Sequence, residues 1–146
     1  MARTQAALEI VLTRNLATIA HEYLQPSPEK GQYANTGIDY GVNGHYELAM
    51  QAIYQPDGPY ETLIGACSGG NIVIVEAILI RKHFDDVSLN SPMWRACNGG
   101  YLDIVKLLIR YGSTNLGYGL SAAINRQHHD VIKYLTERGV TPKPLW

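Results

Sequence analysis

A sequence unit occurs three times in the second half of the chain. Residues 66–75 (ACSGGNIVIV) return as residues 96–105 (ACNGGYLDIV), 30 residues later, and more loosely as residues 123–132 (AINRQHHDVI), a further 27 residues on. A period of this length is typical of stacked supersecondary units, each of which buries its apolar face against its neighbours. Such an array presents a long surface and seldom a deep pocket, so the pattern favours binding to another macromolecule.

Each unit has the pattern of two helices joined by a glycine turn. In the clearest unit, Ser91 is the predicted N-cap, Pro92 suits the first helical position, and Gly99 and Gly100 end the first helix. The second helix carries apolar residues at helical spacing and ends at Gly112. The many β-branched residues of 72–79 favour a strand by local propensity, but their register with the other units indicates a helix.

The pattern extends upstream in weaker form. Residues 44–53 align with residues 100–109, and residues 6–24 read as two further short helices. The predicted fold is therefore an all-α solenoid of about five helix-turn-helix units. It forms one domain over residues 1–146, with clear repeats at 61–139, degenerate units at 5–55 and a tail at 140–146. Pro142 and Pro144 exclude a helix from that tail, which we expect to be extended.

Composition and charge exclude several classes of function. The chain is 46% hydrophobic and 17% charged, as expected of a soluble fold, and its formal net charge is −1. Because no block of lysine and arginine stands out, a nucleic-acid partner is not supported. No apolar run is long enough to span a membrane, and the first residues do not form a secretory signal. We expect an intracellular, cytoplasmic protein.

Reactive side chains are scattered rather than clustered. Cys67 and Cys97 occupy equivalent positions of neighbouring repeats, where packed helices lie too far apart for a disulfide, so both are predicted to be small buried residues in a reducing compartment. The adjacent His128 and His129 point about 100° apart on a helix and do not share a metal ion readily. With no phosphate loop and no base matched to Ser68, we predict no cofactor, no metal and no enzymatic activity.

The residues of the clearest unit resemble an ankyrin repeat. Ser91-Pro92-Met93-Trp94-Arg95-Ala96-Cys97 is similar to the Thr-Pro-Leu-His-x-Ala-Ala motif of that family, and Tyr101–Leu108 and Tyr111-Gly112 match its second helix and closing glycine. The family's motif histidine is replaced by Ile64, Trp94 and Ser121, so packing must replace its hydrogen bonds. The units are shorter than the family's usual repeat, a divergence similar to the short ankyrin units of large DNA viruses or intracellular pathogens, which would place the chain in a host cytoplasm.

The resemblance implies a non-catalytic module that binds a partner protein through its inter-repeat loops and first-helix face. Carried over by position, the loop residues are Asp57, Tyr60, Val87, Ser88, Asn90, Thr114 and Asn115. The first-helix residues are Ser68, Asn98, Asn125 and Arg126. The other hypothesis is a constitutive structural subunit, or a self-associating component of a larger and possibly viral assembly.

Three aromatic features allow two interpretations each. The tyrosines of the first half, with Tyr54 and Tyr60 among them, either fill gaps in the core or form an interface. Trp94 faces either a neighbouring repeat or a partner. The segment that ends in Leu145 and Trp146 either folds back over the last helix pair or docks on another domain.

Overall fold

The computed structural model describes residues 37–145, and within that range it contains eight helices and no strand. The helices are α2 (Gly37–Asn43), α3 (Tyr46–Ala52), α4 (Gly58–Gly69), α5 (Ile72–Arg81), α6 (Asn90–Gly99), α7 (Leu102–Arg110), α8 (Leu116–Arg126) and α9 (His129–Glu137). The predicted all-α repeat fold is confirmed. The helices predicted over residues 6–24 lie outside the described residues, and one domain over residues 1–146 stays a prediction.

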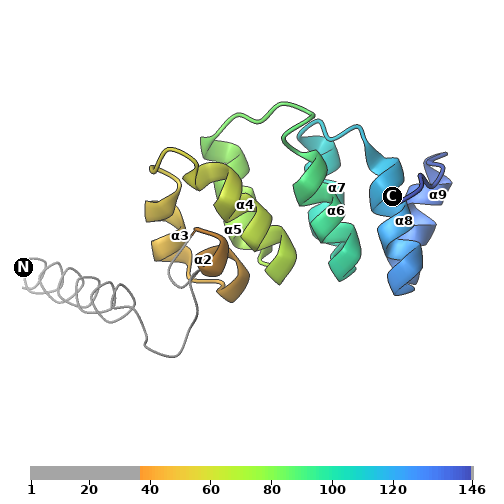
Figure 1. Ribbon diagram of the computed structural model, residues 1–146, viewed down its shortest axis with the longest axis horizontal. Coiled ribbons are helices and arrows are strands. Elements are labelled where there is room, and N and C mark those ends of the chain that lie inside the picture. The colour runs from red at the N-terminus through yellow and green to blue at the C-terminus, as the bar shows by residue number, and fades with distance from the viewer. Residues whose placement is uncertain (1–36, 146) are drawn as a thin grey trace, which may run out of the picture. The chain divides into compact units, whose positions relative to one another are not determined.

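Consecutive helices form pairs that lie side by side in a row (Figure 1). The first helices of successive pairs contact one another, α2 with α4, α4 with α6 and α6 with α8. The second helices do the same, α3 with α5, α5 with α7 and α7 with α9. The row therefore has two layers, and the open side of the first-helix layer is the face that the ankyrin resemblance assigns to partners.

Left-handed backbone at the turn closes each pair. Gly44, Gly70 and Gly100 have φ of 72°, 73° and 75°, a conformation that costs glycine little because it has no Cβ. The predicted glycine turns are thus confirmed. In the last pair, Gln127 takes the same role at φ 60°, as the one non-glycine residue with positive φ in residues 37–145.

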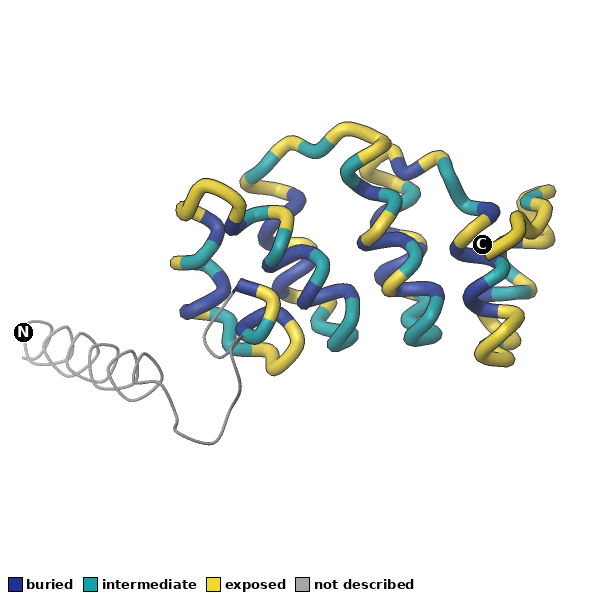
Figure 2. The backbone as a smooth tube through the Cα atoms, in the orientation of Figure 1, coloured by how far each residue is buried: buried dark blue, intermediate teal, exposed yellow. Residues whose placement is uncertain are grey.

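The core lies between the two layers and between neighbouring pairs (Figure 2). Ile74, Val75 and Ile78 of α5 are buried, and so are the equivalent Ile104, Val105 and Leu108 of α7. Burial of this apolar stripe outweighs the preference of β-branched residues for strands, because it recurs at helical spacing and meets the same stripe of the next pair.

The first helices of the first two pairs pack unusually closely. A Cβ on Gly65 would lie 2.2 Å from the carbonyl oxygen of Ile38, and one on Gly41 would lie 2.5 Å from the carbonyl oxygen of Thr62. Glycine at these positions lets the backbones of α2 and α4 approach to a distance that side chains would prevent.

The start of α6 differs from the sequence prediction. The helix begins at Asn90 after Leu89, so Ser91 is not its N-cap and Pro92 is its third residue. The chain turns earlier because Asp85 Oδ1 accepts the Ser88 N–H at 2.7 Å, and because Leu89, fully buried, anchors the turn. Asn90, predicted to lie in a loop, is therefore the first residue of α6. Tyr60, also predicted to lie in a loop, is in the first turn of α4.

Candidate protein-binding surface

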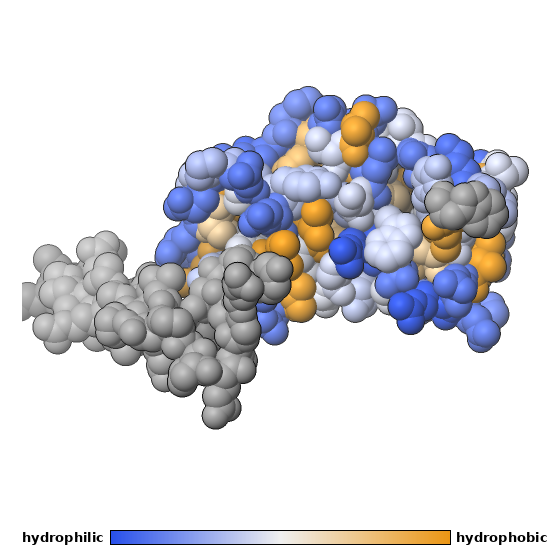
Figure 3. Space-filling model, in the orientation of Figure 1, coloured by the Kyte–Doolittle hydropathy of each residue, from blue (hydrophilic) through white to orange (hydrophobic). Residues whose placement is uncertain are grey.

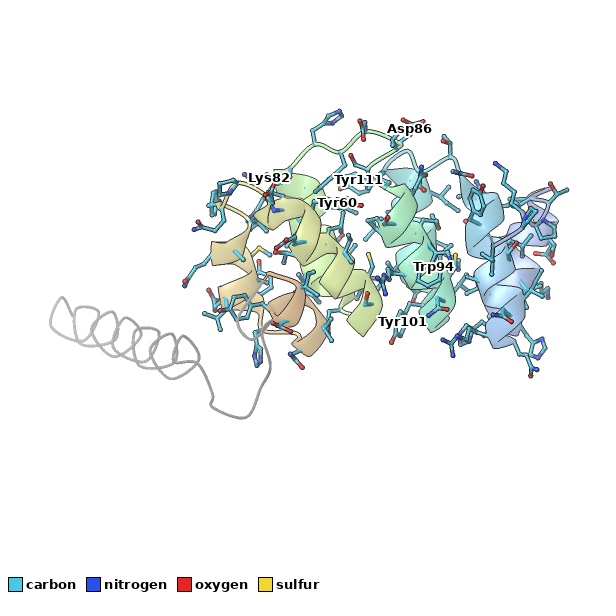
Figure 4. The ribbon with its side chains drawn as sticks, viewed as in Figure 1. Tyr60, Lys82, Asp86, Trp94, Tyr101 and Tyr111 are labelled. Carbon is cyan, nitrogen blue, oxygen red and sulfur yellow. The ribbon has the colours of Figure 1, made fainter. Side chains whose placement is uncertain are left out.

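The predicted binding residues fall at the two ends of the first-helix layer. Those at the loop end are Asp57, Tyr60, Val87, Ser88, Asn90, Thr114 and Asn115. Those at the turn end are Ser68, Asn98, Asn125 and Arg126. Figure 4 shows the two ends, with Tyr60, Lys82, Asp86 and Tyr111 toward the loops and Tyr101 at the opposite turn. The structure thus separates the predicted residues into two groups, with Trp94 between them.

At the loop end, a hydrogen bond connects two successive inter-repeat loops. The Thr114 hydroxyl donates to Asp86 Oδ2 at 3.3 Å, which joins the loop before α8 to the loop before α6. Hydrogen bonds from the side chain and backbone of Ser88 hold the pKa of the Asp85 carboxyl below its ordinary value. Val87 lies between Asp86 and Ser88 and is 68% exposed. The loop before α6 thus exposes an apolar side chain while hydrogen bonds hold its backbone in place.

At the turn end, the residue that follows the turn in each of the last three helix pairs contacts the preceding helix pair. Asn71 Nδ2 donates to the carbonyl oxygens of Gly41 and Val42, the latter at 3.0 Å. The His128 Nε2 lies 2.9 Å from the Asn98 carbonyl oxygen. The Tyr101 ring lies against Gly70, where a Cβ would come within 2.6 Å of it. These contacts supply the inter-repeat hydrogen bonds and packing that the missing motif histidine does not.

Sequence reasoning found only part of this set. The aligned segments place Asn71, Tyr101 and His128 at one position, but the sequence does not assign these residues a contact with the preceding unit. The signal was the register itself, because all three occupy the same place in successive units. Arg126 Nε also donates to Asn98 Oδ1 at 3.2 Å, so two predicted binding residues are hydrogen-bonded to each other.

Other predicted residues are engaged within the chain as well. The Ser68 hydroxyl donates to the Ile64 carbonyl oxygen, and Asn115 Oδ1 accepts from Lys143 Nζ at 3.1 Å. Asp57, Tyr60 and Asn125 are exposed. Asn90 is half-buried, and its Oδ1 accepts no hydrogen bond from the described residues.

A shallow cavity of about 490 Å³ lies on the first-helix layer. Its lining comes from three successive pairs, with Ile64 of α4, Trp94 and Arg95 of α6, Tyr118 of α8, and Leu145 beyond α9. Trp94 is half-buried and lines this cavity, so its side chain is neither fully buried in the core nor fully exposed to solvent. On the face seen in Figure 3, apolar residues are interspersed with hydrophilic ones and do not form one continuous area.

The tyrosines of the first half divide between the two interpretations. Tyr40 is buried, and loss of solvation, with the nearby Asp39 charge, raises the pKa of its hydroxyl. Tyr54 is 72% exposed, and Lys82 Nζ lies 4.8 Å from the centre of its ring. One tyrosine therefore fills the core, while others are available at the surface.

The segment after α9 is extended, as predicted, and folds back along α8. The Lys143 N–H donates to the Gly117 carbonyl oxygen at 3.1 Å, and the Ser121 hydroxyl donates to the Lys143 carbonyl oxygen. The segment thus lies on the first helix of the last pair, on the side of the cavity. Trp146 lies outside the described residues.

Titratable groups do not gather into a reactive centre in the described part of the chain. No group of three histidine, cysteine, aspartate or glutamate side chains in residues 37–145 is placed to hold a metal ion. Cys67 and Cys97 are free and buried, and burial raises the pKa of both thiols, that of Cys97 to about 12. Within the same residues, no helix is long and apolar enough to cross a membrane.

Paired helices with glycine turns, stacked in two layers with an open first-helix face, define a helical repeat protein of the solenoid class. The family model for ankyrin repeats (3 copies) matches residues 63–144, more than half of the chain. The chain belongs to the ankyrin repeat family. Ankyrin repeats generally mediate protein–protein interactions and are typically non-catalytic. Comparison with curated proteins and with solved structures finds no match.

Proposed function

We propose that the chain is a non-catalytic binding module whose partner protein docks on the first-helix layer and the loops at its end. The observation that carries this is the cavity around Trp94, open to solvent and lined by three successive pairs. Tryptophan, tyrosine and arginine are the residues that dominate binding energy at interfaces, and Trp94, Arg95 and Tyr118 meet here.

The predicted residues divide into two roles within this proposal. Exposed residues contact the partner directly: Asp57, Tyr60, Val87 and Asn125. Residues bonded within the array hold the surface in shape: Ser68, Ser88, Asn98, Thr114, Asn115 and Arg126. Asn90 belongs to the first group through its place in the cavity wall. A preorganised surface binds more tightly because less motion is lost on docking.

The test starts from a partner identified by affinity purification from the source cells. Its affinity is then measured for the wild-type chain and for Tyr60→Ala, Asn90→Ala and Asn98→Ala by calorimetry. We expect Tyr60→Ala to weaken binding about tenfold, or about 1.4 kcal/mol. Val73→Ser, on the second-helix layer, is the control and should leave affinity unchanged. Unchanged affinity in all three alanine variants would reject this face.

The exposed face of α5 favours a second candidate, a constitutive subunit of a larger assembly. Val73 and Ile80 are each 66% exposed, while the equivalent residues of the next pair are the charged Asp103 and Arg110. Burial of these two side chains against a permanent neighbour or a second copy would explain the difference. Light scattering of the purified chain tests this candidate, because a monomer at all concentrations argues against self-association.

The two free, buried thiols support a reducing, cytoplasmic location. A host cytoplasm, which the resemblance to short viral units implies, stays a prediction. Fractionation of the source cells with an antibody to the chain tests the location.

A further inference from the structure

The extended segment Thr141–Leu145 lies on α8 as a bound peptide would lie. Both backbone groups of Lys143 form hydrogen bonds. Its N–H donates to the Gly117 carbonyl oxygen, and its carbonyl oxygen accepts from the Ser121 hydroxyl. Its side chain is fixed as well, because Nζ donates to Asn115 Oδ1 at 3.1 Å and lies 5.4 Å from the centre of the Tyr118 ring. One residue thus makes a hydrogen bond or ring contact with four residues in or beside the first two turns of α8.

The last unit departs from the other two at the positions that this segment contacts. Gly117 stands where α4 and α6 carry Tyr60 and Asn90, and Ser121 stands where they carry Ile64 and Trp94. A Cβ on Gly117 would lie 2.8 Å from Lys143 Cγ and 2.9 Å from the Thr141 carbonyl oxygen. The missing side chain opens a groove, and the serine hydroxyl supplies a donor for an extended backbone.

The segment fills this groove incompletely. All five of its residues are exposed, and Leu145 remains 47% exposed at the edge of the Trp94 cavity. A second hollow of about 260 Å³ lies beside Thr141 and Lys143. Pro142 and Pro144 have no N–H to satisfy and favour an extended chain before binding. Few buried contacts hold the segment, so its release costs little free energy.

We propose that the groove over α6 and α8 is a docking site for an extended segment of a partner protein, in which prolines flank a basic residue and an aliphatic residue follows. Thr141–Leu145 occupies this site within the chain and is displaced when the partner binds. This inference rests on the proposed function, since it assigns part of the first-helix layer a ligand. The partner's aliphatic residue takes the place of Leu145 at the Trp94 cavity, which has a volume of about 490 Å³.

The first experiment uses the full chain and a fluorescent peptide with the sequence of residues 139–146. The double variant Lys143→Glu/Leu145→Ser releases the internal segment but leaves the groove intact. A tethered segment competes at a local concentration of about millimolar, so we expect the peptide to bind the double variant at least about tenfold more tightly than the wild type. Amide resonances of Gly117, Tyr118 and Ser121 should shift on peptide addition.

Two further variants locate the site. Gly117→Ala, added to the double variant, should abolish peptide binding, because its Cβ fills the groove. Gly117 has no left-handed backbone, so alanine is compatible with the helix there. His129→Ala, exposed at the start of α9 and outside the predicted binding residues, is the control and should leave peptide binding unchanged. A peptide with glutamate at the position of Lys143 should bind more weakly.

Equal peptide affinity for the wild type and the double variant, or binding that survives Gly117→Ala, would overturn the proposal. So would a wild-type dimer that dissociates in the double variant, because the site would then hold the segment of a second copy. A partner whose affinity falls in Tyr60→Ala but does not rise in Lys143→Glu/Leu145→Ser would overturn the displacement while the proposed function stands.

Discussion

The Nε2 atom of His128 lies 2.9 Å from the carbonyl oxygen of Asn98, thirty residues earlier in the chain. The carbonyl can only accept, so Nε2 carries the proton. The imidazole also packs on Gly100, where a Cβ would lie 2.5 Å from Nδ1. One side chain at the turn therefore joins the last pair to the pair before it, by a hydrogen bond and by contact.

Removal of this link should destabilise the array. We expect His128→Ala to lower the free energy of unfolding by about 1–2 kcal/mol, since a partly buried hydrogen bond and its packing are lost. His129→Ala, exposed and next in sequence, is the control and should change stability by less than about 0.5 kcal/mol. Urea denaturation followed by circular dichroism measures both. Equal effects of the two substitutions would contradict the link.

The sequence predicted the turns but not all of what they do. Register alone placed Asn71, Tyr101 and His128 at one position, yet an amide, a phenol and an imidazole share no chemical signature. That they all reach back to the preceding unit depends on the spacing between pairs, which only the assembled structure contains.

Close approach of α2 and α4 makes a second prediction. Alanine exceeds glycine in helix propensity by about 1 kcal/mol, so Gly65→Ala should stabilise an isolated α4. In the folded chain its Cβ would lie 2.2 Å from the Ile38 carbonyl oxygen, a backbone atom that cannot move alone. We therefore expect a net loss of more than about 2 kcal/mol.

Thermal denaturation of Gly65→Ala against Ser68→Ala, one turn further along the same helix, checks this expectation. Within residues 37–145, the Ser68 hydroxyl donates to the Ile64 carbonyl oxygen of the same helix, so its substitution should be close to neutral. A Gly65→Ala protein as stable as the wild type would mean that the two helices lie further apart.

The fate of the segment after α9 shows where sequence reasoning stops. Pro142 and Pro144 predict an extended chain, and the structure agrees. Its path over α8 depends on the absence of a side chain at Gly117. It also depends on the hydroxyl of Ser121, which lies 22 residues before Lys143 in the sequence. The start of α6 was misplaced for a similar reason, because the buried Leu89 outweighs the capping preference of Ser91.

Strain at the last turn makes a third prediction. Gln127 adopts φ 60°, a conformation that costs a residue with a Cβ about 1 kcal/mol relative to glycine. Gln127→Gly should raise the free energy of unfolding by up to about 1 kcal/mol, as urea denaturation can measure. Asn125→Gly, two residues earlier and still helical, should lower it by a few tenths of a kcal/mol. A Gln127→Gly variant that is destabilised would show that its side chain contributes more than its backbone costs.

The buried thiols predict a loss of stability at alkaline pH. Burial raises the pKa of Cys97 from 9.0 to about 12, so the native chain keeps a proton that the unfolded chain releases. The stabilisation is complete below pH 9.0, the pKa of an unperturbed thiol, and is lost progressively as the pH rises toward that of the buried thiol. Between about pH 8 and about pH 10, each such thiol should lower the free energy of unfolding by about 1.4 kcal/mol.

Urea denaturation at the two pH values, for the wild type and for Cys97→Ala, isolates this contribution from other alkaline titrations. Cys97→Ala loses packing against Met93 at both pH values, but its stability should fall by about 1.4 kcal/mol less between them. Cys67, whose pKa is also raised by burial, contributes equally to both proteins and cancels. Identical losses in the two proteins would show that the Cys97 thiol reaches solvent in the native array, and hence that α6 and α8 separate at this point.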